Sequence, residues 1–109
     1  MTQKHELLTS NIDSLLLSMI NKQSMYGYQI IKELEGRSQG YFKFKEGTLY
    51  PALHRLENSG LIEGKWQVLG NGQQRKYYYL TAKGLESLAE KKSHWNEFFV
   101  AMNLIIHAE

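Results

Sequence analysis

The stretch KFKEGTLYPALHRLENSGLIEGKW, residues 43–66, contains an amphipathic helix whose polar side is unusual. Apolar residues at helical spacing predict its buried side: Leu49, Ala52, Leu53 and Leu56. Small, planar and hydrogen-bonding residues make up the opposite side and its flanks: Gly47, Tyr50, Pro51, His54, Arg55 and Asn58. An ordinary solvated face carries mainly glutamate and lysine, so this face predicts a binding function.

The start of this helix favours contact with an anion. Thr48 is the predicted N-cap, which makes Pro51 the third helical residue, where its missing N–H costs no hydrogen bond. Lys43 and Lys45 lie just upstream, close to the free N–H groups of the first turn. At the other end, Gly60 predicts a left-handed cap.

Side chains of these kinds suit a helix in the major groove of DNA, where Arg and polar groups read base edges or hold phosphates. The alternative is structural: Tyr50 packs on a neighbouring helix, while His54 and Arg55 are merely solvated. For the face as a whole, the sequence favours DNA.

The rest of the chain predicts a winged helix, mainly α with a small β-hairpin. Two helices come first, over 10–22 with Ser10 as N-cap and over 26–36 with Gly36 as the stop. After the helix described above, two β-prone runs over 61–69 and 75–80 flank GNGQQ and predict a hairpin. We therefore expect a winged helix-turn-helix DNA-binding domain over residues 1–80 and a dimerisation helix over 81–109.

The hairpin offers a second DNA contact. Arg75 and Lys76 lie at the base of its glycine-rich tip, within reach of backbone phosphates. Residues 43–76 hold six basic and three acidic side chains, a local charge of +3 in a chain whose net charge is +2. The alternative is a plain hairpin with two solvated cations.

The last helix, predicted over 81–107 with Thr81 as N-cap, is too long for a winged helix to cover. A second copy related by a two-fold axis is the simplest cover. The predicted dimer residues are Leu88, Trp95, Phe98, Phe99, Met102 and Ile106. Trp95 and Phe99 would also form a slot for a planar aromatic effector, unless Trp95 is only part of the dimer core.

Composition excludes several other classes. The 109 residues include no Cys, which removes disulfides and thiolate sites, and no apolar run is long enough to span a membrane. We expect a cytoplasmic protein. The histidines show no metal-ligand spacing and Asp13 is the one Asp in the sequence, so we expect neither an enzyme nor a metal or cofactor. The rival function is a winged helix that binds another protein.

Three segments, YGYQIIKEL (26–34), GTLYPALHRLENSGLIEGKW (47–66) and RKYYYLTAKG (75–84), closely resemble the PadR family of bacterial transcriptional regulators, over roughly residues 7–107. The resemblance implies a winged-helix homodimer that binds double-stranded DNA. It also implies a recognition helix that enters DNA with Thr48, Tyr50, Pro51, His54 and Arg55, and a wing that reaches it near Arg75 and Lys76.

The single C-terminal helix resembles the short subgroup of that family. This subgroup includes multidrug-sensing repressors in which a Trp from each subunit stacks on a flat ligand at the dimer centre. Trp95 occupies the matching position. The wing departs from many relatives at Gln73 and Gln74, where they are more basic, so the expected grip on phosphate is weaker.

Overall fold

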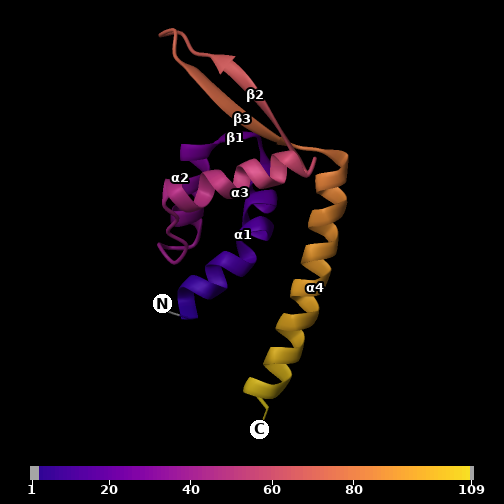
Figure 1. Ribbon diagram of the computed structural model, residues 1–109. Coiled ribbons are helices and arrows are strands. Elements are labelled where there is room, and N and C mark those ends of the chain that lie inside the picture. The colour runs from indigo at the N-terminus through magenta and orange to yellow at the C-terminus, as the bar shows by residue number, and fades with distance from the viewer. Residues whose placement is uncertain (1–2, 109) are drawn as a thin grey trace.

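The computed structural model describes the backbone of residues 3–108 and the side chains of residues 11–108. In chain order the elements are α1 (Gln3–Lys22), β1 (Met25–Tyr26), α2 (Gly27–Arg37), α3 (Glu46–Asn58), β2 (Ile62–Val68), β3 (Gln74–Leu80) and α4 (Ala82–Ile106). The first three helices form the body, the β2–β3 hairpin projects from one end of it, and α4 runs down one side (Figure 1). The predicted fold class, a winged helix-turn-helix with a long C-terminal helix, is confirmed.

The core lies among α1, α2, α3 and the base of the hairpin. Its fully buried large side chains are Leu16, Leu17, Met25, Ile30, Leu49, Leu53, Leu56, Ile62 and Leu88. These residues come from every helix and from two strands, so the body and the first turns of α4 share one core.

Helix α1 is longer than the sequence predicted. It begins at Gln3, so the predicted start at residue 10 is wrong, and the side chain of the predicted cap, Ser10, lies outside the described residues. The physical reason is that residues 3–10 contain no Gly or Pro, and nothing in them interrupts helical hydrogen bonding.

The sheet has three antiparallel strands in the order β1-β3-β2. Hairpin strands β2 and β3 were predicted, whereas β1 was not: Tyr26 was assigned to the start of the second helix, and Met25 was assigned to no element. Met25 pairs with Tyr78 and Tyr26 with Tyr77. A strand of two residues is too short to show alternation, and only its tertiary partner defines it.

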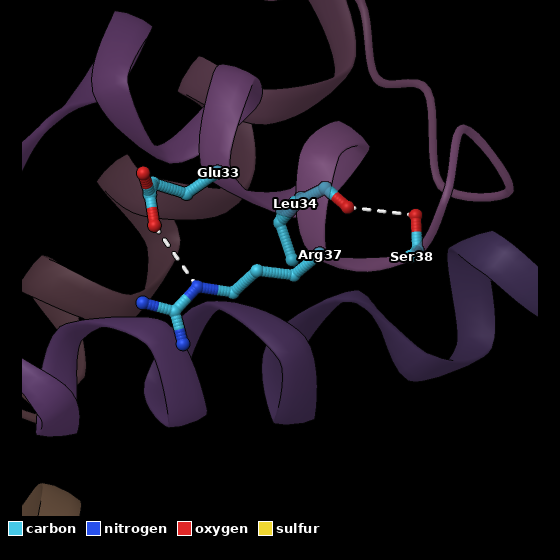
Figure 2. A network of polar contacts seen from close by, with 4 residues as sticks. All are labelled: Glu33, Leu34, Arg37 and Ser38. Atoms are coloured by element: carbon cyan, nitrogen blue, oxygen red, sulfur yellow. Dashed lines mark hydrogen bonds and ion pairs between the residues drawn. The ribbon is translucent and has the colours of Figure 1, made fainter.

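Helix α2 passes through Gly36, the predicted stop, and ends at Arg37. Arg37 Nε donates to Glu33 Oε1 at 2.9 Å, and Ser38 Oγ donates to the Leu34 carbonyl at 2.7 Å, so both side chains hold the last turn (Figure 2). The left-handed backbone expected at the helix end comes later, at Gln39 and Gly40, whose φ angles are 54° and 83°.

Helix α3 begins two residues before Thr48, the predicted cap, since Lys45 is the N-cap and its side chain makes no capping hydrogen bond. Pro51 is therefore the sixth helical residue rather than the third, and the prediction that it costs no hydrogen bond is wrong. The carbonyl of Gly47, four residues earlier, loses its helical donor, but Gly47 is exposed and water can reach it. Gly60 caps the other end as predicted, with a φ of 78°.

One polar joint connects α3, the sheet and α4. Thr81, the predicted N-cap of α4, accepts a hydrogen bond at Oγ1 from the Gly84 N–H at 3.0 Å. The same hydroxyl lies 2.7 Å from the carbonyl of Gly60, just beyond the end of α3. A Cβ on Gly84 would lie 2.0 Å from the Leu61 carbonyl oxygen, so the backbones pass too closely for any other residue.

Candidate DNA interface

The two sides of α3 divide as the sequence predicted. Leu49, Ala52, Leu53 and Leu56 are buried in the core. The opposite side is exposed over its whole length and carries Thr48, Tyr50, Pro51, His54 and Asn58. The helix therefore presents hydroxyl, imidazole and carboxamide groups to the outside, and the buried leucines hold it against the body.

Tyr50 is fixed by a close contact with α2. A Cβ built on Gly27, the first residue of α2, would lie 2.6 Å from both Cε1 and Oη of the Tyr50 ring. The ring thus rests on the bare glycine backbone and keeps 41% of its surface exposed. Partial burial, together with the nearby Glu46 carboxylate, raises the pKa of the Tyr50 phenol, which stays a neutral hydrogen-bond donor.

Arg55, predicted to contact DNA, is already paired within the chain. Its Nη2 donates to Oδ1 of Asp13 on α1, and the two residues are 42 positions apart in sequence. The guanidinium retains 55% of its exposure, but its charge is matched by a carboxylate. The pair connects α1 to the last turn of α3.

The two predicted wing cations lie on opposite faces of β3. Lys76 turns toward α3, where Nζ donates to Oε1 of Glu57 at 2.9 Å, and this hydrogen bond raises the lysine pKa. Arg75 turns to the other face, with its guanidinium carbon 4.3 Å from the centre of the Tyr26 ring. The ring of Tyr26 in turn meets that of Tyr77 edge-on.

Lys43 and Lys45 flank the entry to α3 and are both exposed. Phe44 between them is buried in the core, which anchors the loop and turns its two neighbours outward. The structure therefore brings the two lysines to the same end of α3 as Thr48, as the sequence predicted.

A groove between the wing and the helices contains a residue that sequence reasoning missed. Its walls include Tyr50, Arg75, Lys76 and Trp66, and its volume is about 360 Å³. Trp66 lies on the wing with 65% of its surface exposed. The sequence predicted the strand that carries Trp66 but assigned this residue no role, and the hairpin projects past the body and leaves the indole uncovered.

A second pocket lies between α1 and α4, with a volume of about 290 Å³. Ser14, Leu15 and Ser18 of α1 face Lys91, Lys92 and Trp95 of α4 across it. The indole of Trp95 stacks on the ring of Phe99, with centroids 5.1 Å apart and planes 11° from parallel. The two predicted effector residues are therefore neighbours, and half of each side chain is exposed.

The predicted dimer residues do not all share one environment. Leu88 is 2% exposed and belongs to the core of its own chain, so it has no surface to offer a partner. The other five are exposed, namely Trp95, Phe98, Phe99, Met102 and Ile106, and the neighbouring Leu104 and Ile105 are exposed as well. Beyond Trp95, the apolar side chains of α4 are thus left uncovered by the chain itself.

Within residues 3–108, no helix combines the length and apolarity needed to cross a membrane. Among residues 11–108, whose side chains the structure describes, no group of three His, Cys, Asp or Glu side chains is arranged to hold a metal ion.

This architecture, with an exposed helix beside a β-wing, defines a winged helix-turn-helix DNA-binding fold. Residues 16–90 match the family described as "Transcriptional regulator PadR-like family". The chain belongs to this family and is a transcriptional regulator.

Similar proteins match this chain over most of its length. A protein of Lysinibacillus sphaericus is 34% identical over 94 residues, which are 86% of each chain. A PadR-like transcriptional regulator of Bacillus cereus has a solved structure that is 33% identical and covers 95% of this chain and 99% of its own, with a TM-score of 0.84. The PadR of Bacillus subtilis, solved in complex with operator DNA, shares the fold with a TM-score of 0.67, at 24% identity over 72% of this chain and 45% of its own.

Proposed function

We propose that this regulator is a cytoplasmic homodimer that binds a near-palindromic operator through α3 and represses transcription until an aromatic effector releases it. The observation that carries the proposal is the exposed side of α3, which bears Thr48, Tyr50, Pro51 and His54 rather than ordinary surface charges. The Bacillus subtilis relative, which has the same fold, was solved with operator DNA.

In the proposed complex α3 lies in the major groove, with His54 and Thr48 toward base edges and Tyr50 toward the backbone. Lys43 and Lys45 hold phosphate at the entry to the helix, and Arg75 and Lys76 do so from the wing. Arg55 has a different role: its pairing with Asp13 favours a residue that fixes the angle of α3 over one that reads DNA.

The uncovered half of α4 supports the dimer. On a 100° wheel Trp95, Phe98, Phe99, Met102 and Ile106 fall within one side of the helix, and exposing them all in a monomer would be costly. A two-fold pair buries the same side twice and places two copies of α3 on successive turns of DNA.

The pocket between α1 and α4 supports an effector site. The stacked pair of Trp95 and Phe99 suits a planar aromatic ring, and Lys91 and Lys92 at the pocket favour a ligand with an acidic or acceptor substituent. A ligand there acts on DNA binding by favouring one separation of the two α3 helices over another.

The test is fluorescence anisotropy of the protein on DNA from upstream of its own gene, with random-sequence DNA as competitor and a salt series. We expect competitor-resistant binding that weakens steeply with salt, because phosphate contacts release counterions. Sequence-blind or salt-insensitive binding would instead favour the alternative, a winged helix that binds another protein.

The effector is tested separately with Trp95→Ala. We expect planar aromatic acids to lose most of their affinity for this variant, while operator binding by a verified dimer changes little. Equal losses of ligand and operator binding would make Trp95 a dimer residue and remove the sensor from the proposal.

A further inference from the structure

The face of the β2–β3 hairpin that turns toward α3 is buried at the base of the hairpin and exposed toward its tip. Strand alternation places Ile62, Trp66 and Val68 of β2 on this face, opposite Lys76 and Gln74 of β3 in the register. Ile62 is buried, whereas Trp66 and Val68 are 65% and 72% exposed. The β2–β3 hairpin extends away from the body (Figure 1), which agrees with the exposure of both side chains.

This open face forms one wall of the groove described above, and α3 with the start of α2 forms the other. On this face Tyr50 offers a phenol group, Gln74 a carboxamide and Lys76 an ammonium group. Arg75 and Tyr26 also line the groove, but their side chains stack on each other on the other face of the sheet. Among the described residues that line the groove, none carries a carboxylate. Glu57 instead holds Lys76 from outside the lining, with Nζ 2.9 Å from its Oε1, and so fixes the ammonium at the wall.

An occupant of this groove must therefore be anionic at some points and apolar at others. A sugar–phosphate strand alternates in this way, since each phosphate is followed by a deoxyribose with an apolar face. The groove is also continuous with the exposed side of α3, because Tyr50 belongs to both. A small anion would use the charged and polar groups but would leave the exposed indole of Trp66 without a contact.

We propose that this groove seats one sugar–phosphate strand of the operator, with the indole of Trp66 packed on deoxyribose and Gln74 and Lys76 on the adjacent phosphates. The inference rests on the proposed DNA-binding function and adds an uncharged contact to it. Aromatic and apolar side chains that pack into the sugar and groove surface hold DNA without adding to the salt dependence.

The direct test uses fluorescence, because the chain has two tryptophans. In the variant Trp95→Phe, Trp66 is the single tryptophan, and its quenching by acrylamide is measured with and without operator. We expect bound operator to lower the quenching constant of Trp66 at least twofold. The matched control, Trp66→Phe, leaves Trp95 as the reporter, and its quenching should not change with operator.

The energetic test measures operator affinity. Trp66→Ala should weaken binding about tenfold with an unchanged salt slope. Gln67→Ala is the control from the other face of the same strand, where its Nε2 donates to the Tyr79 hydroxyl at 2.9 Å, and it should change affinity less than twofold. Circular dichroism checks that each variant is folded.

These outcomes distinguish failure of the groove assignment from failure of the proposed DNA-binding function. Two results would overturn the groove assignment and leave the proposed function intact. One is that Trp95→Phe binds operator specifically while Trp66 stays as accessible to acrylamide as before. The other is that Trp66→Ala binds operator with full affinity. Protection of Trp66 by an aromatic carboxylate but not by operator makes the groove a small-molecule site and also overturns it. No specific binding by the unmodified protein overturns both.

Discussion

Replacing Gly27 by alanine is expected to displace Tyr50 from the DNA interface without unfolding the protein. The added Cβ would lie 2.6 Å from Cε1 and Oη of Tyr50 and 2.7 Å from Cζ, against about 3.5–4.0 Å for a comfortable carbon contact. The ring is the end of a half-exposed side chain, so it can swing away rather than force the backbones apart. The cost is the lost packing between α2 and α3.

The expected change in unfolding free energy for Gly27→Ala is compared with that for Gly36→Ala in the same helix. A Cβ on Gly36 would meet nothing within 4 Å, so Gly36→Ala gains only helix propensity, up to about 1 kcal/mol. Gly27→Ala has a similar gain but loses about 1–3 kcal/mol to overpacking. We therefore expect Gly27→Ala to be less stable than Gly36→Ala by roughly 1–2 kcal/mol.

Urea unfolding at one fixed protein concentration measures this difference, because the stability of a dimer depends on concentration. Operator affinity is measured beside it: Gly27→Ala should bind as weakly as Tyr50→Ala, whereas Gly36→Ala should bind normally. In a Tyr50→Ala background the clash is gone, and Gly27→Ala should then cost nothing further. Equal stability and equal operator affinity for the two glycine variants would refute the claim that Gly27 fixes the ring.

Three further predictions concern caps and ion pairs. Thr81→Ala should cost about 1 kcal/mol in urea unfolding, as loss of an N-cap does, while Thr48→Ala should stay within about 0.5 kcal/mol because Thr48 caps nothing. Asp13→Asn and Arg55→Gln should each weaken operator binding, and the double variant should bind no worse than either single variant. If Arg55→Gln alone lowers the slope of log affinity against log salt concentration by about one, Arg55 contacts a phosphate directly. The stability that Lys76 contributes should be fully present below the ordinary lysine pKa of 10.5 and should fall only as pH rises through its raised pKa in the folded protein. Urea unfolding of the protein and of Lys76→Gln across pH measures this contribution. A decline already between pH 7 and 9 would contradict the pairing of Lys76 with Glu57.

The sequence was sufficient for features that depend on local periodicity. The leucine spacing of residues 49–56 predicted which side of α3 is buried, and Gly60 and Thr81 predicted their caps correctly. The two-stranded hairpin followed from its aromatic and β-branched runs around a glycine-rich turn. In each case the signal and the structure that it determines lie within a few residues of each other.

The missed features depend on contacts between distant segments. Arg55 read as a solvated or DNA-bound cation, because nothing near it in sequence marks Asp13 as its partner. Trp66 was assigned to a strand and given no role, because alternation cannot tell how far a hairpin projects beyond the body. Leu88 read as part of the interface stripe, although α1 reaches the first turns of α4 and leaves only the distal residues uncovered.

The joint at Thr81 has a consequence for how the regulator measures DNA. Helix α4 has 25 residues and is therefore about 37 Å long at 1.5 Å per residue. Because the first turns of α4 share the core of the body, the two move as one rigid unit, and a rotation of that unit by about 5° moves the far end of α4 by roughly 3 Å. In the proposed dimer, where the far ends meet, a slight slip between the two α4 helices resets the gap between the two α3 helices. The Thr81 hydroxyl and the close backbone contact at Gly84 fix the angle between α4 and the end of α3. In the proposed dimer this angle sets the distance between the two α3 helices, which must match the helical repeat of DNA.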